Sequence, residues 1–113
     1  MRLKSALWVA AYLRRCQIEG CSAVVRRRGA EEAGAIFVRI CRLDGTSELF
    51  GPAPQSALEP GADDRIFSAC LASQPALDPE IETYLLRETK FDSDLWILEI
   101  EDRSGRNFLN IIC

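Results

Sequence analysis

The sequence predicts an α+β protein with a mainly antiparallel sheet of five to six strands and two helices packed on one face of it. Two segments repeat apolar residues at helical spacing, at 5–19 and 78–91, and most of the remaining apolar segments alternate with the period of a strand. Short turns join most of the strand segments, which favours antiparallel neighbours. A chain of 113 residues has the size of one domain, which we place at 1–113.

The first helix is expected over residues 5–19. Its predicted buried face is one apolar stripe, ended by Gly20 as a C-terminal stop. Trp8 and Tyr12 lie beside that stripe, and their four-residue spacing favours packing over an exposed docking pair. The stripe consists of Leu3, Ala6, Leu7, Ala10, Leu13 and Gln17.

The first three strands follow. Residues 23–28 form a strand that ends at Gly29, and residues 35–42 form the clearest one, with Ile36, Val38 and Ile40 on one face and Phe37, Arg39 and Cys41 on the other. Asp44-Gly45 predicts a type I′ hairpin that leads into a strand over 46–50.

The second half of the chain is expected to begin with a long surface loop over 51–65, because three prolines and two glycines fall there. A strand over 66–71 follows. Asp78 is expected to cap the second helix and Pro79 to take its first position, with Ile81, Tyr84, Leu85, Glu88 and Phe91 on one face. A strand over 95–102, a turn at Ser104-Gly105 and a strand over 108–112 complete the sheet.

The chain contains no histidine, so it holds no Ser-His or Cys-His catalytic pair and no imidazole ligand for a metal. Its net charge of -3 argues against charge-driven nucleic-acid binding. The charge is unevenly placed: residues 1–45 hold nine Lys/Arg and four Asp/Glu, and residues 46–113 hold five and thirteen. Either the two halves intermingle and neutralise each other, or the surface is polarised for head-to-tail contact or an anionic ligand.

Five cysteines, at 16, 21, 41, 70 and 113, form no CxxC pair and no zinc-ligand spacing. Scattered thiols suit a reducing compartment, where they act as small apolar residues. The start of the chain lacks a signal-peptide cleavage site, and no apolar run is long enough to cross a membrane. These features predict a cytoplasmic protein without a membrane segment.

The acidic stretch 91–102 is the best enzymatic candidate. Glu99 and Glu101 share a strand face, about 7 Å apart by strand rise, and could hold Mg²⁺ or Ca²⁺ or divide the roles of acid and base. Asp92 and Asp94 could add ligands. The alternative is a solvated strand face paired with arginines, and no metal site is assigned.

Arg26, Arg27 and Arg28 are the best anion-binding candidates, because arginine forks bind phosphate or carboxylate bidentately. Strand alternation would send Arg27 to one face and its two neighbours to the other. The alternative is pairing with the acidic strand. Together with Arg14 and Arg15, these arginines could also contact nucleic acid, although the net charge makes that partner unfavourable.

Two further residues stand out. Glu88 falls within the apolar face of the second helix, where a carboxylate is usually paired with an arginine and otherwise is a perturbed group in a cleft. Cys70 lies in an apolar strand and is expected in the core, because the chain has no histidine to activate it.

Three stretches carry a family resemblance: Arg2 to Val9, Arg42 to Thr46, and Asp94 to Trp96 with Glu99 to Arg103. In order and spacing they resemble the small alphaproteobacterial proteins called domain of unknown function 1491. The resemblance spans nearly the whole chain. It implies a cytoplasmic, single-domain α+β protein and brings no assigned activity, cofactor or partner.

Taken together, these features favour a non-catalytic module that docks onto an unknown protein partner and needs no cofactor. The alternatives are a hydrolase dependent on a divalent metal, built on Glu99 and Glu101, and a weak nucleic-acid or anion binder that uses the arginines. A homodimer is the other partner class left open.

Overall fold

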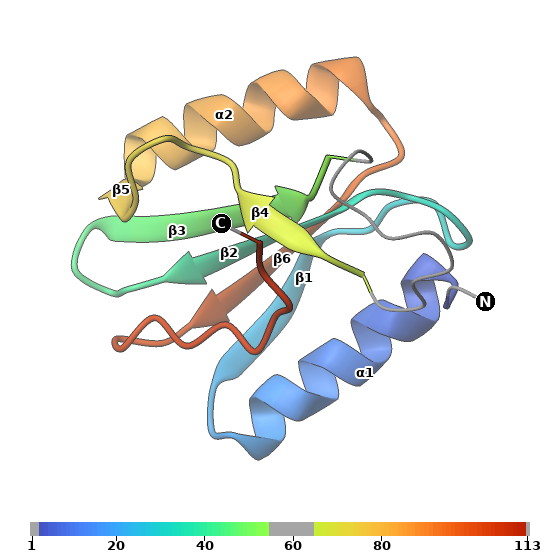
Figure 1. Cartoon of the computed structure of the whole chain (residues 1–113), viewed down its shortest axis with the longest axis horizontal. Coiled ribbons are helices and arrows are strands. Elements are labelled where there is room, and N and C mark those ends of the chain that lie inside the picture. The colour runs from blue at the N-terminus through green and yellow to red at the C-terminus, as the bar shows by residue number, and fades with distance from the viewer. Residues whose placement is uncertain (1–2, 55–64, 113) are drawn as a thin grey trace.

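The computed structural model describes residues 3–54 and 65–112. Two helices and six strands follow one another along these residues (Figure 1). The first helix was expected over 5–19 and is found at nearly those bounds. The second ends at Phe91 as expected but begins one residue early, at Asp78, with Leu77 in the N-cap position. In chain order the elements are α1 (Ser5–Ile18), β1 (Ser22–Arg27), β2 (Ile36–Cys41), β3 (Thr46–Pro52), β4 (Phe67–Ala69), β5 (Ala76–Leu77), α2 (Asp78–Phe91) and β6 (Trp96–Glu101).

The strands form one sheet in the order β1-β6-β2-β3-β4, with β5 paired to β3. This confirms the α+β class and the five to six strands. The sheet is mixed rather than purely antiparallel, because β6 inserts between β1 and β2 and runs parallel to β2. In that register Arg39 of β2 lies beside Glu99 of β6.

The expectation that both helices pack on one face of the sheet is wrong. α1 packs on a cluster that includes Val38, Leu98 and Ile100, whereas α2 packs on a separate cluster that includes Phe37 and Ile97. Figure 1 shows the resulting three layers, with the sheet between the helices. The reason is that β2 and β6, near the centre of the sheet, carry apolar side chains on both faces, such as Val38 and Leu98 on one and Phe37 and Ile97 on the other, so each face needs a cover.

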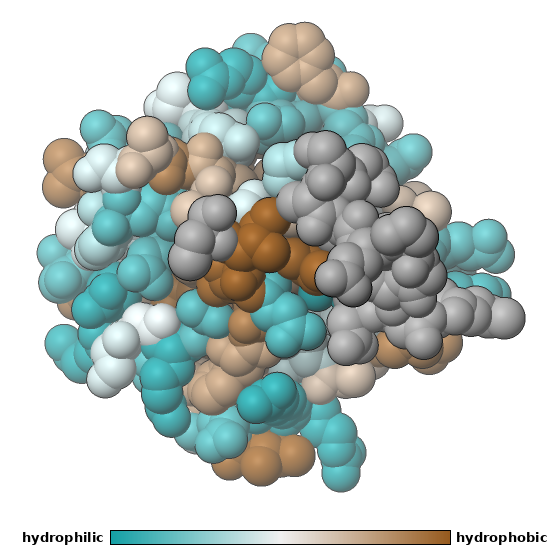
Figure 2. Space-filling model, in the orientation of Figure 1, coloured by the Kyte–Doolittle hydropathy of each residue, from teal (hydrophilic) through white to brown (hydrophobic). Residues whose placement is uncertain are grey.

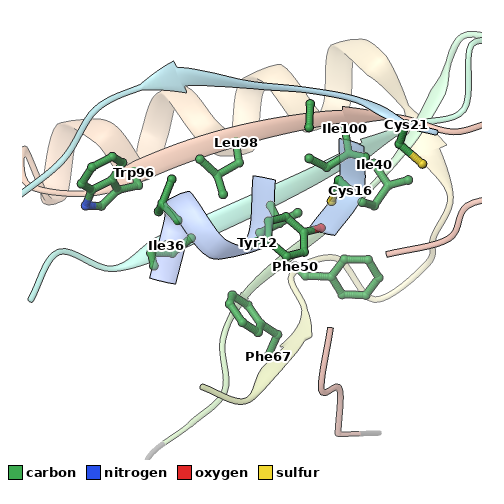
Figure 3. Close-up of a cluster of buried hydrophobic side chains, with 13 residues drawn as sticks. Tyr12, Cys16, Cys21, Ile36, Ile40, Phe50, Phe67, Trp96, Leu98 and Ile100 are labelled. Atoms are coloured by element: carbon green, nitrogen blue, oxygen red, sulfur yellow. The ribbon is translucent and has the colours of Figure 1, made fainter. Parts of the chain in front are cut away.

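The buried stripe of α1 also differs from the expected one. Tyr12 and Cys16 point into the core (Figure 3), and Val9 is buried in the same cluster. Leu3 and Leu7 are more than half exposed. The helix carries two apolar stripes, and the one that fits the β-branched sheet surface is buried. The packing of Trp8 with Tyr12 is confirmed, because their rings stack with centroids 4.9 Å apart. Gly20 adopts positive φ and ends the helix as expected.

The hairpin between β2 and β3 forms where it was expected, but its turn type differs. Arg42 N donates to Thr46 O, so the loop has three residues, and Leu43 and Gly45 have positive φ. Asp44 instead accepts hydrogen bonds from the backbone and hydroxyl of Thr46. The aspartate therefore stabilises the loop through its side chain and not through the type I′ geometry.

The C-terminal strand expected over 108–112 does not form. A single bridge joins Ile111 to Phe67, and Phe67 N donates to Asn110 O. Figure 2 shows apolar atoms gathered where this segment crosses β4. The segment thus covers the outer edge of β4 without extending the sheet. The turn at Gly105 is confirmed by its positive φ and its hydrogen bond to Asp102 O.

Two further predictions concern the loop after β3 and the strand that follows it. The strand expected over 66–71 is shorter, at Phe67–Ala69, and most of the loop expected over 51–65 lies outside the described residues. Within the described residues no helix has both the length and the apolar character needed to span a membrane.

Candidate functional site

A cluster of arginines and carboxylates lies between the sheet and the N-terminal half of α2. Its centre is Arg39 of β2, which is 6% exposed. The Arg39 guanidinium lies 3.0 Å from Asp78 Oδ1 and 2.6 Å from Glu82 Oε1, both on α2, and 3.0 Å from Glu99 Oε2 on β6. Its Nε donates to Ser47 Oγ on β3. One cation therefore joins three strands to a helix.

Arg26 of β1 completes the cluster. Its guanidinium donates to both carboxylate oxygens of Glu82, at 2.8 and 2.6 Å, and to Glu99 Oε2 at 3.0 Å. The hydrogen bonds from Arg26, followed by those from Arg39, hold the pKa of the Glu82 carboxyl below its usual range although burial opposes this. The interpretation that Arg26 pairs with the acidic strand is confirmed.

Asp78 was expected to cap α2, but it does not. Among the described residues no side chain caps the helix, and Asp78 Oδ1 instead accepts a 2.6 Å hydrogen bond from Ser47 Oγ. The carboxylate is drawn away from the helix N–H groups by a hydroxyl and a buried guanidinium. Two arginines and three carboxylates are thus paired with each other, which suits a structural cluster.

The three consecutive arginines do not alternate as expected. A β-bulge interrupts the register between Val25 and Arg27. As a result Arg26 and Arg27 both line the side of β1 that faces α2. Arg28 lies instead over the Trp96 ring, 5.0 Å from its centroid. Alternation fails here because a bulge adds one residue to one strand only.

Next to the cluster lies an open groove of about 370 Å³ between β1 and α2. Its floor is apolar, formed by Leu85 and Ile97, and Leu86 on its rim is 61% exposed. Arg27 also lines the groove and, among the residues the structure describes, makes no ion pair. The full lining is Arg26, Arg27, Glu82, Thr83, Leu85, Leu86, Thr89 and Ile97. A groove of this character can take an apolar side chain flanked by a carboxylate.

The candidate metal ligands do not converge. Glu99 is held by Arg26 and Arg39, while Glu101 is exposed further along β6. Asp92 and Asp94 precede the strand, where Asp92 Oδ1 accepts from Asp94 N. Asp94 lies five positions before Glu99, which corresponds to about 16 Å along an extended chain. Across residues 3–54 and 65–112 no three cysteine or carboxylate side chains are grouped to hold a metal ion.

Glu88 faces Cys70 and Tyr84 rather than an arginine, so the pairing expected for it is not seen in the described residues. Cys70 lies in an open pocket of about 650 Å³ that Tyr84 also lines. Burial raises the pKa of the Cys70 thiol to about 12, with a hydrogen bond from Tyr84 acting in the opposite direction. A thiol so far from its thiolate form is no nucleophile at neutral pH. The expected core position of Cys70 is wrong: because β4 ends at Ala69, Cys70 is half-buried and packs against the edge of the core.

The remaining candidate arginines are dispersed. Arg15 lies over the Phe108 ring on the α1 side, and Arg14 is exposed on the same helix. Neither shares a surface with the groove. The residues that sequence reasoning missed are Arg39, Ser47 and Glu82. The signal that could have found them is Arg39 itself, an arginine within an otherwise apolar strand. A buried cation requires carboxylates nearby, so its position predicts a charged cluster.

Comparisons with known proteins give a consistent result. A crystal structure of a DUF1491 family protein from Caulobacter crescentus CB15 is 34% identical to this chain. The TM-score is 0.81, and the match covers all of both chains. The solution structure of protein Atu0922 from A. tumefaciens is 43% identical, with a TM-score of 0.83, and the match covers 99% of this chain and 96% of that one. An NMR structure of a family member from Caulobacter crescentus CB15 is 35% identical, with a TM-score of 0.80, covering 100% and 99% of the two chains. A search of curated proteins found no match.

The model of the family described as protein of unknown function DUF1491 matches residues 3–110. The resemblance seen in the sequence is thereby confirmed, and the chain belongs to the DUF1491 family.

Proposed function

We propose that this chain is a non-catalytic module that docks onto another protein through the groove between β1 and α2. The observation that carries the proposal is the combination, in one groove, of an apolar floor with an arginine that has no ion pair among the described residues. Leu86 on the rim is largely exposed, and an exposed leucine beside an open apolar groove costs free energy until a partner covers it.

The state of the titratable groups supports the same function. The carboxylates nearest the groove, Glu82 and Glu99, are held by arginines, and the Cys70 thiol is protonated at neutral pH. A general acid or base needs a pKa near the working pH, and a nucleophile needs an activating neighbour. Surface complementarity therefore accounts for these residues better than chemistry does.

We place the module in the reducing cytoplasm. Cys16, Cys21, Cys41 and Cys70 are free thiols, and the first two are buried. Cys16 lies among apolar side chains, whereas the Cys21 thiol also contacts Asp102 and Arg106. Burial raises the pKa of both thiols, and Cys16 behaves as a small apolar residue. Such a set is typical of a compartment that keeps thiols reduced.

The proposal is tested by photo-crosslinking in A. tumefaciens cells, the source of one relative. A photoreactive amino acid replaces Leu86 on the groove rim or, as a matched control, Leu43 in the hairpin loop, which is 47% exposed. We expect a discrete adduct of one molecular mass from position 86 and none from position 43. The adduct should weaken when Arg27→Glu is added, because the change reverses the charge on the rim.

Equal adducts from both positions would contradict the docking function, and so would the absence of any adduct from position 86. The melting temperature of each variant should stay close to that of the unmodified chain, since both replaced side chains are exposed. That control separates loss of the partner from loss of the fold.

A further inference from the structure

We propose that the docking segment binds as an added strand along the free edge of β1, antiparallel to it, with acidic residues followed by β-branched residues. The inference rests on the proposed docking function and names the partner's chemistry and binding mode. It starts from the two edges of the sheet, which differ in how they are covered.

The β4 edge is covered by the chain itself. Phe67 N donates to Asn110 O at 2.8 Å, and Ile112 N donates to Phe67 O at 3.0 Å. By contrast, β1 is the terminal strand at the other edge and, among the described strands, pairs with β6 alone. Within the described part of the chain, no other segment forms backbone hydrogen bonds with residues 22–28. An uncovered edge of this kind is a template for another strand.

β1 carries two features that protect an edge, its arginines and a bulge, but both lie after Val25. Residues 22–25 contain no proline and no charged side chain and keep a regular register. Val24 and Val25 are 53% and 39% exposed. They lie on opposite faces, because Val24 pairs with Glu99 and Val25 with Leu98. An added strand would cover both valines.

The groove lies on the α2 side of this edge. Alternate side chains of an added strand would therefore project over Val24, towards Leu86 and Arg27. The other side chains would project over Val25 and towards Arg28, which stacks on Trp96. One strand would thus use the backbone edge, the apolar groove and the arginines together.

Charge fixes the composition of the partner and, for an antiparallel strand, the order of its residues. From Val24 to Arg28 the side chains at this edge change from valines to arginines, of which Arg26 and Arg28 are exposed and Arg27 is half-buried. An antiparallel partner meets the arginines first, so its matching order is acidic residues followed by β-branched ones. Arg27 has no ion pair among the described residues, and it is the cation such a carboxylate would contact first.

The probe is the capped hexapeptide Glu-Asp-Glu-Val-Ile-Val, titrated into the ¹⁵N-labelled full chain and followed by NMR. We expect shifts confined to β1 and the groove, slowed exchange of the outward amides of residues 22–25, and cross-strand contacts in antiparallel register. Arg27→Glu should weaken binding about tenfold, while Arg14→Glu, an exposed arginine on α1, should not.

Two N-methylated isomers of the peptide separate the binding modes. Each carries methyl groups on alternate residues, so only one of them loses the N–H groups that face β1. Strand addition predicts that one isomer binds at least about tenfold more weakly and the other as the parent does. If both isomers bind equally while Leu86 still shifts, strand addition is wrong and docking through the groove stands.

Two other results overturn the inference. If millimolar parent peptide changes no chemical shift of the chain, a partner strand of acidic and β-branched residues is ruled out. The crosslink from position 86 would still report on docking itself. A doubled mass in native mass spectrometry, with residues 22–25 protected before peptide is added, would show that a second copy occupies the edge.

Discussion

Arg39 is the residue that determines how α2 sits on the sheet. It is 6% exposed, and its guanidinium has partners on β3, α2 and β6. A buried guanidinium is tolerated only when its N–H groups find acceptors, so any shift of α2 along the sheet would lose hydrogen bonds. The cluster therefore specifies one position of the helix, which in turn forms one wall of the groove.

The pH dependence of stability in a Glu82→Gln variant tests whether the ionised carboxylate of the cluster stabilises the fold. The hydrogen bonds from Arg26 and then from Arg39 lower the pKa of Glu82 from its ordinary value of 4.5. A lowered pKa in the folded state means that the carboxylate contributes stability above about pH 4.5 and loses it as pH falls through the folded-state pKa. We expect Glu82→Gln to reduce the free energy of unfolding at pH 7 by about 1 kcal/mol, because the side chain is partly exposed.

Urea unfolding at about pH 7 and about pH 3 measures this effect. The difference between the native chain and Glu82→Gln should be largest at neutral pH and should shrink in acid. The matched control is Glu80→Gln, an exposed residue in the first turn of the same helix. A difference that stays constant with pH would show that the carboxylate is not ionised in the cluster.

Part of the cluster could be predicted from the sequence. Pairing of Arg26 with the acidic strand required only two strands of opposite charge, and it is found. The role of Asp78 could not be predicted, because a cap depends on local spacing whereas Ser47 is 31 positions away. Arg39 was placed on the correct strand face, but its partners depend on the position of α2.

At the scale of elements, periodicity located both helices and most strands but not the faces they bury. α1 has two apolar stripes of similar size, and only the sheet surface selects between them. On α2, Ile81 and Leu85 are buried as expected, but Phe91 is 85% exposed because the helix ends beyond the sheet. The bulge in β1 likewise leaves no clear mark in a sequence of valines and arginines.

A substitution at Gly29 tests how closely the loop between β1 and β2 must approach the start of β6. A Cβ at this position would overlap the Asp94 carbonyl and the backbone of Leu95, so the loop needs a glycine to pass beside the start of β6. The same loop is anchored there by the 2.8 Å hydrogen bond from Ala30 N to Asp94 O. We expect Gly29→Ala to lower the free energy of unfolding by about 1–3 kcal/mol, through displaced backbone.

The control for this variant is Ala33→Ser, an exposed position in the same loop that should change the free energy of unfolding by less than about 0.5 kcal/mol. Urea unfolding monitored by tryptophan fluorescence suits the measurement, because Trp96 Nε1 donates to Ala30 O in this loop. A Gly29→Ala variant as stable as the native chain would show that the loop can move away from Asp94 at no cost.

For the whole molecule, the sheet order was the feature that local patterns could not supply. Short connections predict that strands consecutive in sequence are neighbours in the sheet. Instead, β6 inserts between β1 and β2. The uneven charge of the sequence is partly neutralised within this arrangement. Five ion pairs of the cluster join arginines of β1 and β2 to carboxylates of α2 and β6. The two halves of the chain thus intermingle at the cluster, while Arg27 has no ion pair in the described residues and keeps its charge for a partner.

This topology predicts that the chain can be divided into two parts that fold only together. A fragment of residues 1–54 contains β1 and β2, which are not neighbours in the sheet, so it lacks the strand that joins them. A fragment of residues 55–113 supplies that strand, β6, but without a partner on either side. The first fragment has nine Lys/Arg and five Asp/Glu, and the second has five and twelve. Opposite net charges favour their encounter.

We expect each fragment alone to lack the circular dichroism and amide dispersion of the intact chain, and an equimolar mixture to recover both. Association should slow as salt rises, because long-range attraction between exposed charges is screened. Reversing the cluster in one fragment, with Arg26→Glu and Arg39→Glu, should abolish recovery by placing like charges against Glu82 and Glu99. If the fragment of residues 1–54 folds alone, the central position of β6 does not control assembly, because the remaining strands can then form a sheet without it. If the fragment of residues 55–113 folds alone, β6 needs neither of its neighbours in the sheet.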